Sequence, residues 1–281
     1  MPDQPPLPST PAPDAVRVAG LRLERGGRAI LSDIDLVVPR GSITAVLGPS
    51  GSGKSTLLAA LTGELQPAAG SVEVLGAPLP TRRRELLALR RSIGVLLQGN
   101  GLLTDLTAAE NVALPLRTHT GLPKPVIARL VEMKLHAVGL RAAAELYPRE
   151  LSGGMARRVA LARALALDPP LMIYDEPLTG LDPIASGVIM SLISRLNASL
   201  GLTSIIVTHH VHETLPVVDR ALVTAGGRIV FSGTPDELEG STDPLVRQFL
   251  RGEPDGPIPF DTTPRDDGRS ESAPAGTRQA A

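Results

Sequence analysis

The stretch Gly48-Pro49-Ser50-Gly51-Ser52-Gly53-Lys54-Ser55-Thr56 decides how the rest of the chain is organised. An apolar run before it predicts a buried strand, and leucines at helical spacing after it predict a helix. Glycines let consecutive backbone N–H groups curl around a phosphate, and the positive end of the helix dipole faces the same point. Strand, glycine-rich loop and helix in this order predict a phosphate-binding loop. In such a loop Lys54 reaches the terminal phosphates and the Ser55 hydroxyl ligates Mg²⁺.

The composition narrows the class of protein. The chain of 281 residues has 28 lysines plus arginines against 29 acidic residues, which argues against a general nucleic-acid binder. It has no cysteine, which is compatible with the cytosol. No uncharged apolar run approaches the roughly 18 residues that span a bilayer, and the proline-rich start is not that of a secretory signal. Work at a membrane would therefore require docking onto another protein that spans it.

Changes in composition along the chain predict its domains. Residues 1–14 are proline-rich and predict a disordered arm, whereas residues 252–281 predict a mostly disordered extension. Residues 15–251 between them alternate strand-like and helix-like patterns, beginning with antiparallel strands that flank the strand before the phosphate-binding loop. Residues from about 99 to 168 show helical patterns, with one helix expected over residues 126–146. This region predicts a helical subdomain inserted into an α/β domain.

Two adjacent carboxylates follow a second buried strand. Residues 171–174 read Leu-Met-Ile-Tyr and lead directly into Asp175 and Glu176. Removing two carboxylates from water at the end of a buried strand is unfavourable unless a cation or a substrate needs them. A candidate functional site is therefore a better interpretation than an acidic surface turn.

Other polar segments each keep two interpretations. Ser152 before two glycines predicts a capped helix start, which is either purely structural or a second anion-binding helix N-terminus. Residues 82–84, all arginine, indicate the solvated face of a short helix, with a contact to anionic lipid headgroups as the alternative. His209, His210 and His212 form a cluster, but a zinc site would need further ligands and is disfavoured.

In this order, the motifs resemble those of the ATPase subunits of ABC transporters. The resemblance covers residues 16–260 and rests on the phosphate-binding loop, Gln98, Leu151–Met155, Asp175–Glu176, Leu181–Asp182 and His209. It implies an α/β fold of the P-loop NTPase type, with a mixed sheet core, an antiparallel β flank and an inserted helical subdomain. It also implies an enzyme that binds ATP and Mg²⁺ and hydrolyses ATP.

The resemblance assigns a role to each matching residue. The residues implied to bind ATP phosphates are Gly48, Pro49, Ser50, Gly51, Ser52, Gly53, Lys54, Ser55 and Thr56. Those implied to ligate Mg²⁺ are Ser55, Gln98 and Asp175. Glu176 is implied to polarise the attacking water and His209 to contact the γ-phosphate. The signature segment, Ser152, Gly153, Gly154 and Met155, is implied to act on ATP held by a second chain, with Asp182 at the seam of the dimer.

Two positions depart from the family pattern. Most ABC ATPases stack adenine on an aromatic residue shortly before the phosphate-binding loop, but here Arg25 stands at the corresponding place. A guanidinium can stack on a base, so Arg25 is expected to do so weakly. His210 stands where an aspartate usually follows the histidine, for no evident physical reason. Strand alignment favours His209 over His210 as the residue that faces the phosphate.

Further segments narrow the resemblance to the ATPases of Mla phospholipid-transport systems, which maintain outer-membrane lipid asymmetry in Gram-negative bacteria. The segments that carry this narrower resemblance are Met155–Arg158, Pro115–Thr120, Met133–Arg141 and Val246–Phe260. This resemblance implies a homodimer at the cytoplasmic face of the inner membrane, which drives a permease dimer and moves phospholipids between the two membranes. It further implies a small STAS-domain partner on the helical subdomain, a periplasmic MCE-type lipid-binding protein, and residues 256–260 as an anchor onto the neighbouring ATPase.

Other functions remain open at this point. One alternative keeps the ABC ATPase but changes the cargo to another lipid, a sterol or a hydrophobic solute. Another is a regulatory nucleotide-binding module with little hydrolysis, which Glu176, His209 and the full signature segment disfavour. ABC proteins of DNA repair or of ribosomes usually carry coiled coils, charged linkers or a second cassette, and the sequence has none of these.

Overall fold

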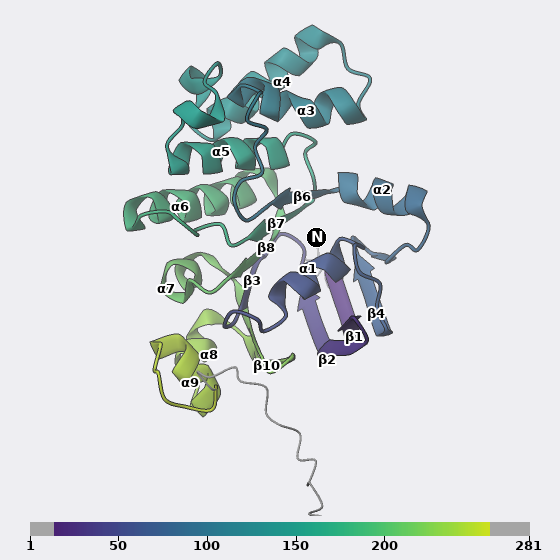
Figure 1. Cartoon of the computed structure of the whole chain (residues 1–281), viewed down its shortest axis with the longest axis vertical. Coiled ribbons are helices and arrows are strands. Elements are labelled where there is room, and N and C mark those ends of the chain that lie inside the picture. The colour runs from purple at the N-terminus through teal and green to yellow at the C-terminus, as the bar shows by residue number, and fades with distance from the viewer. Residues whose placement is uncertain (1–13, 259–281) are drawn as a thin grey trace, which may run out of the picture.

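The structure, a computed structural model, describes residues 14–258 and arranges them as two sheets with a group of helices at one end (Figure 1). Nearly all of the proline-rich arm, and the C-terminal extension beyond residue 258 with Phe260, lie outside the described residues. Within the described part of the chain, no helix is both long enough and apolar enough to cross a membrane.

The larger sheet has six strands, and the predicted site residues follow three of them, β3, β7 and β8. Its strand order is β10-β9-β3-β8-β7-β6. The bounds are β3 Ile43–Leu47, β6 Ile93–Leu96, β7 Leu171–Asp175, β8 Thr203–Thr208, β9 Arg220–Ala225 and β10 Arg228–Gly233. All neighbours are parallel except β10, which runs antiparallel to β9. Every residue of β3 and β8 is buried, as expected for parallel strands covered on both faces.

The smaller sheet is antiparallel, in the order β2-β1-β4-β5. Its strands are β1 Val16–Arg25, β2 Arg28–Val38, β4 Ala69–Val74 and β5 Ala77–Pro78. The strands β1 and β2 do not pair with β3, whose neighbours are β8 and β9. Burial alternates along β1 and β2, so one face of this sheet packs on the core and the other stays in water.

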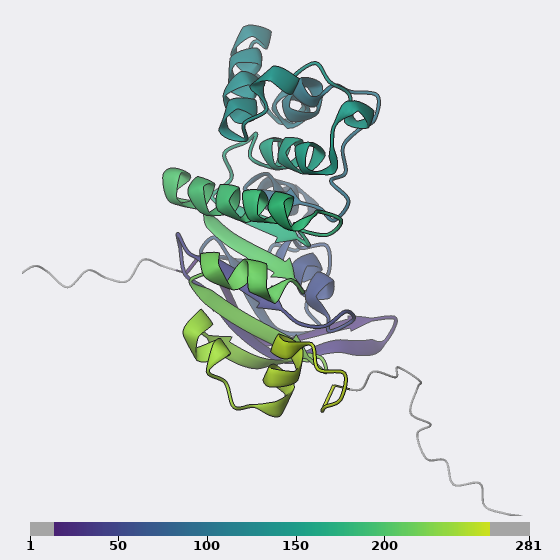
Figure 2. The same ribbon diagram turned by 90° about the vertical axis from the view of Figure 1, so that its left-hand side faces the viewer.

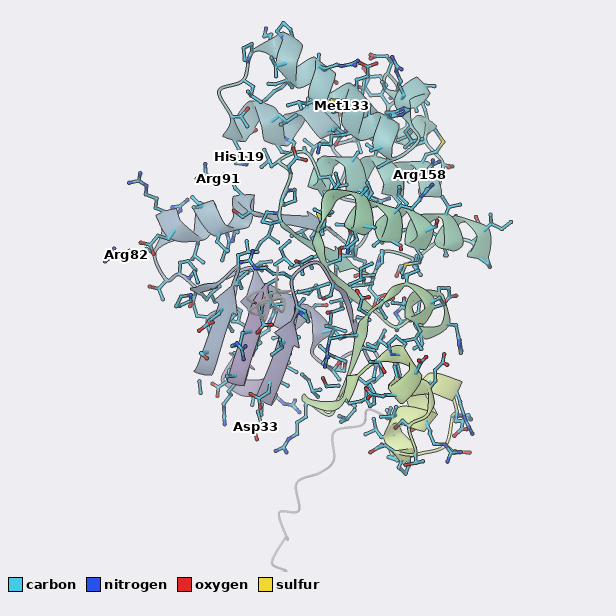
Figure 3. All side chains as sticks on the ribbon, turned by 180° about the vertical axis from the view of Figure 1, so that it is seen from behind. Asp33, Arg82, Arg91, His119, Met133 and Arg158 are labelled. Atoms are coloured by element: carbon cyan, nitrogen blue, oxygen red, sulfur yellow. The ribbon has the colours of Figure 1, made fainter. Side chains whose placement is uncertain are left out.

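The helices differ in how far they are buried. Their bounds are α1 Lys54–Leu61, α2 Arg83–Arg91, α3 Ala108–His119, α4 Lys124–Ala137, α5 Gly153–Ala164, α6 Pro183–Leu200, α7 Val211–Thr214, α8 Pro235–Glu239 and α9 Pro244–Arg251. Short 3₁₀ turns complete them, namely η1 Arg141–Ala143, η2 Pro148–Glu150 and η3 Leu215–Val217. None of the α2 residues is buried, and Arg82 and Arg91 mark the two ends of this exposed helix (Figure 3).

Between β6 and β7 the chain forms helices and no strand, and α3, α4 and α5 stack at the end of the molecule opposite α8 and α9 (Figures 1 and 2). The single helix expected over residues 126–146 is wrong in its second half, because α4 ends at Ala137. Gly139 follows with a φ of 70°, a left-handed conformation that ends helices, and η1 then turns the chain.

Asn111 ties the loop after β6 to α3. Its side chain is fully buried, and its Oδ1 accepts a hydrogen bond of 2.9 Å from the N–H of Leu103. Its Nδ2 donates to the carbonyl oxygens of Leu103, Leu106 and Thr107 at 3.0 to 3.1 Å. One side chain therefore satisfies several backbone groups of a loop that has no regular secondary structure of its own.

Replacing this side chain should destabilise the protein. In Asn111→Ala the N–H of Leu103 loses its partner inside the protein, so we expect the free energy of unfolding to fall by about 1–3 kcal/mol. Chemical denaturation followed by circular dichroism would measure the change. Thr118→Ala, an exposed position on the same helix, should change stability by no more than about 0.5 kcal/mol. An equal effect of both variants would contradict the role of Asn111.

Candidate functional site

The candidate site lies where three parallel strands end together. The phosphate-binding loop follows β3, the carboxylate pair ends β7, and His209 follows β8. Leu47 pairs with Thr208, and Asp175 pairs with Val207, so the carboxyl ends of these strands are level with one another. Sheet register thus brings together residues that are more than a hundred positions apart in the sequence.

The phosphate-binding loop rests on β9. Gly48 has a φ of 151°, and a Cβ at this position would lie 2.3 Å from the carbonyl oxygen of Thr224, so only glycine fits without a shift. The Thr224 hydroxyl donates to the carbonyl of Leu47 at 3.1 Å and lies 2.8 Å from the Ser52 hydroxyl. Thr224 was not predicted as part of the site, and it contacts both the residue before the loop and the middle of the loop.

Lys54 is the cation at the centre of the loop. It is buried, and its Nζ donates to the carbonyl oxygens of Gly48 at 2.7 Å and Pro49 at 2.9 Å. Burial lowers the pKa of Lys54, while the negative charges of Glu176 and Asp175 raise it. The ammonium group therefore binds the carbonyls of its own loop, and phosphate oxygens can replace these carbonyls as its partners.

Asp175 is a carboxylate whose charge is incompletely compensated. Burial raises its pKa, the neighbouring Glu176 raises it further, and Lys54 lowers it. An additional cation at this point would therefore be favourable. The predicted partners, the Ser55 hydroxyl and the Gln98 amide, are both on exposed residues and supply hard oxygen ligands. The residues present thus fit a bound Mg²⁺.

Glu176 is held in an unusual backbone conformation. Its φ of 47° is left-handed, and its N–H donates to the carbonyl of Val207 at 2.8 Å. The Thr208 hydroxyl donates to Glu176 Oε2 at 3.0 Å, and His209 Nδ1 lies 3.0 Å from Oε1. His209, and not His210, is thus at hydrogen-bonding distance from this carboxylate. Both carboxylate oxygens are positioned by β8 and the residue that follows it.

The signature segment and Asp182 lie together at the starts of α5 and α6, away from the phosphate-binding loop. The Ser152 hydroxyl accepts from the N–H of Met155 at 3.3 Å and caps α5, and Asp182 accepts from Ala185 at 2.9 Å and caps α6. The cap predicted at Ser152 is confirmed. The two helix starts line one open groove, to which Ser152, Gly153, Gly154, Met155 and Asp182 all contribute. None of residues 48–56 lines it, so this groove is separate from the phosphate-binding loop of the same chain.

Two arginines of α5 were missed by sequence reasoning. Arg157 donates to the carbonyls of Leu97 at 3.2 Å and Thr179 at 3.0 Å, and Arg163 donates to those of Asn100 and Gly101 at 2.9 and 2.6 Å. Burial lowers the pKa of both guanidinium groups. They fasten the Gln98 loop to the helix that begins with the signature segment. Their partners are backbone carbonyls far away in sequence, so no local pattern indicates them.

Arg25 is a predicted site residue whose side chain the structure does not connect to the phosphate-binding loop. It is exposed at the end of β1, beside the turn at Gly26 and Gly27 that leads into β2. No contact within the described chain directs its guanidinium towards the phosphate-binding loop.

Comparisons with known proteins agree with this geometry. The sequence model of the family described as ABC transporter matches residues 31–179. The chain is 50% identical over 246 residues to the intermembrane phospholipid transport system ATP-binding protein MlaF of Haemophilus influenzae, covering 87% of this chain and 93% of that protein. It is 39% identical over 245 residues to the probable ribonucleotide transport ATP-binding protein mkl of Mycobacterium leprae, covering 87% and 71%.

Solved structures give the same result for the fold. The dimeric post-hydrolysis state of the ATP-binding cassette MJ0796, bound to ADP and Pi, matches with a TM-score of 0.71 and 30% identity over 78% of this chain and 98% of that chain. The predicted fold class, an α/β P-loop ATPase with a mixed sheet and an antiparallel flank, is confirmed. The chain belongs to the ABC transporter family and is one of its ATP-hydrolysing subunits.

Proposed function

We propose that this chain is the ATP-hydrolysing motor of a transport system that moves phospholipids between the inner and outer membranes. The observation that carries the proposal is the 50% identity to an intermembrane phospholipid transport ATP-binding protein, over 93% of that protein. The site supports the same activity, because a loop lysine, two carboxylates and a histidine converge where a triphosphate would end.

In the proposed reaction ATP binds with its phosphates in the loop of residues 48–56. Lys54 then exchanges the carbonyls of Gly48 and Pro49 for phosphate oxygens. Mg²⁺, held by Ser55, Gln98 and Asp175, would neutralise charge on the phosphates. Glu176, oriented by Thr208, polarises the attacking water once His209 turns from the carboxylate to the γ-phosphate. Arg25 contributes a weak stacking contact to the adenine.

Removing the charge of Glu176 should separate binding from hydrolysis. Glu176→Gln keeps the shape of the side chain but cannot accept a proton, so we expect ATP hydrolysis to fall by about a hundredfold or more. ATP affinity should stay close to that of the unmodified protein. Phosphate release and nucleotide titration would measure the two quantities. Glu213→Gln, at an exposed position on α7, is the matched control and should hydrolyse ATP normally. Near-normal turnover in Glu176→Gln would refute the role of this residue.

The separate groove at the signature segment supports a dimer. Phosphoryl transfer needs donors all around the γ-phosphate, and the loop half of one chain supplies only part of them. The N-terminus of α5 offers backbone N–H groups and a positive dipole end to a phosphate held by a second chain. We infer that two chains sandwich two ATP molecules, as the dimeric structure of the MJ0796 cassette supports.

A negative charge in the groove should prevent this dimer. A Cβ at Gly154 would lie 3.6 Å from the Cβ of Ala185, which is an ordinary van der Waals contact, so the backbone tolerates a side chain at this position. Glu176→Gln alone should dimerise when ATP is added, because it retains unhydrolysed ATP. Adding Gly154→Asp should abolish this dimer while each chain still binds ATP. Light scattering would report the mass. Gly121→Asp, where a side chain meets open space, is the control. A dimer that survives Gly154→Asp would refute the arrangement.

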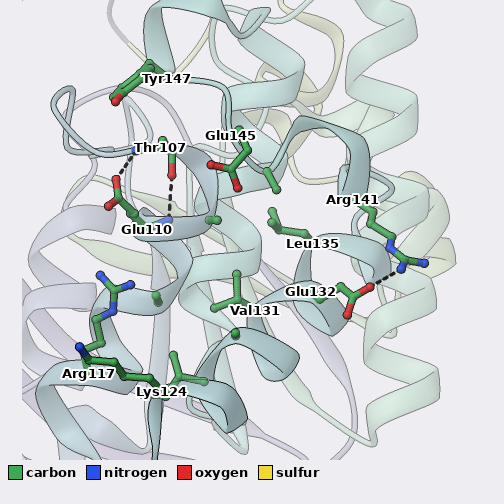
Figure 4. A pocket seen from close by; sticks show the side chains of 15 residues that line it. Thr107, Glu110, Arg117, Lys124, Val131, Glu132, Leu135, Arg141, Glu145 and Tyr147 are labelled. Carbon is green, nitrogen blue, oxygen red and sulfur yellow. Dashed lines mark hydrogen bonds and ion pairs between the residues drawn. The ribbon is translucent and has the colours of Figure 1, made fainter.

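The proposed partners lie at and across the membrane. They are a permease dimer, a periplasmic MCE-type lipid-binding protein and a small STAS-domain protein on the helical subdomain, with the ATPase peripheral at the cytoplasmic face of the inner membrane. A groove of about 940 Å³ between α3 and α4 supports a docking surface on that subdomain. Arg117 and Lys124 lie at one end of it, and the ion pair of Glu132 with Arg141 at the other (Figure 4).

The start of the C-terminal extension is folded back onto α9. The side chain of Gln248 is buried, and its Nε2 donates to the carbonyl of Ile258 at 3.0 Å while its Oε1 accepts from the N–H of Ile258 at 2.7 Å. A Cβ at Gly256 would lie 2.5 Å from this amide. We propose that residues 256–260 anchor this chain onto the neighbouring ATPase, and that the contact of Gln248 with Ile258 fixes the start of this segment on α9.

Co-purification tests the cargo assignment. The chain would be isolated in detergent from its own cells, and the bound proteins identified by mass spectrometry. We expect a lipid permease, an MCE-domain protein and a small STAS-domain protein together. A different permease without an MCE-domain protein would refute phospholipid transport and leave the ATPase assignment intact.

A further inference from the structure

We propose that Glu176, His209 and His210 form a binding site for a transition-metal ion such as Zn²⁺, and that the bound ion inhibits ATP hydrolysis. Each of the three side chains offers one ligand atom, and these atoms all lie within 4.8 Å of one another. In the sequence, the cluster of His209, His210 and His212 has too few ligands nearby for zinc. The structure supplies the missing one, because the left-handed backbone at Glu176 turns its carboxylate towards the end of β8.

The spacing of the ligand atoms fits a tetrahedral ion. Glu176 Oε1 and His209 Nδ1 lie 3.0 Å apart. Bonds of about 2.0–2.1 Å to Zn²⁺ place two ligands of a tetrahedron about 3.3 Å apart. The ring centroids of His209 and His210 are 4.3 Å apart, and the nitrogen that His210 offers lies within 4.8 Å of the other two ligand atoms.

The surroundings resemble those of a metal site in two further respects. The Thr208 hydroxyl donates to Glu176 Oε2 and so orients Oε1 towards His209, as outer hydrogen bonds orient metal ligands. The side chain of His209 is 47% exposed whereas that of Glu176 is 12% exposed, so an ion can enter from solvent and meet a protected carboxylate. Three protein ligands leave a fourth position for water.

The ligand chemistry separates this site from the Mg²⁺ site. Mg²⁺ takes oxygen ligands, and two imidazoles with one carboxylate favour Zn²⁺ and similar ions. His210 is the discriminating residue. Within residues 14–258 neither of its ring nitrogens makes a hydrogen bond, and only its backbone N–H does, to Thr208 Oγ1 at 3.1 Å. A metal ligand is thus a function for a side chain that the ATPase reaction does not use.

Inhibition follows from which atoms the ion would occupy. Glu176 Oε1 bound to an ion no longer polarises water, and His209 bound through Nδ1 no longer turns to the γ-phosphate. Zn²⁺ would therefore hold the nucleotide-free site in an inactive arrangement until it is removed. The ion and productively bound ATP compete for the same two side chains.

Direct binding of the metal alone tests the site. Nucleotide-free protein is titrated with Zn²⁺ in a non-chelating buffer by calorimetry, and Co²⁺ absorption reports the ligand geometry. We expect one ion per chain in the unmodified protein, and affinity at least about tenfold weaker in His210→Ala. His212→Ala is the matched control, because it removes an exposed histidine of the same segment that is outside the cluster. Its affinity should be unchanged.

The functional consequence is measured with excess Mg²⁺ and ATP. His210→Ala should hydrolyse ATP normally without zinc, which also shows that it is folded. At least about tenfold more Zn²⁺ should be needed to inhibit it than to inhibit the unmodified protein or His212→Ala. Equal zinc affinity in His210→Ala and the unmodified protein would overturn the proposal, as would the absence of stoichiometric binding. Either result would leave the ATPase assignment untouched, since Glu176→Gln tests that separately.

Discussion

The parallel pairing of β3 with β8 and of β8 with β7 is the constraint on which the rest of the structure depends. A slip of one residue in this register would turn the buried side chains of β8 to the opposite face and move Thr208 away from Glu176. The strands are buried on both faces, so their apolar packing sets the register strongly. The polar groups of the site are then positioned at the strand ends without having to stabilise the sheet themselves.

The site is held in a state that is unfavourable without its substrate. A left-handed backbone at a glutamate costs about 1–3 kcal/mol, and it persists because Val207 and Thr208 bind its N–H and its carboxylate. Lys54 is buried next to two carboxylates, one of which has a raised pKa. Preorganised charge of this kind is what stabilises a phosphoryl-transfer transition state, since the buried lysine and the two carboxylates are already held at the strand ends before the reaction begins.

Sequence reasoning succeeded where a local feature is set by residues a few positions apart. The glycine-rich loop after β3 and the cap at Ser152 are features of this kind, and the structure has both. It failed where a contact joins distant segments. Thr224 is 177 residues from its partner Leu47, and Arg157 is 60 residues from Leu97. The predicted end of the helix after residue 126 was wrong for a different reason. The apolar spacing continues past Gly139, but the left-handed backbone at Gly139 ends the helix there.

The two arginines of α5 have a mechanical consequence. Guanidinium groups at Arg157 and Arg163 bind four carbonyls, two of which belong to Asn100 and Gly101 in the Gln98 loop. A helix of 12 residues is stiff along its axis, so a push on that loop displaces the whole helix rather than bending it. The start of the same helix carries Ser152 and the glycines. The helix thus transmits movement of the Gln98 loop to the groove that its start lines together with the start of α6.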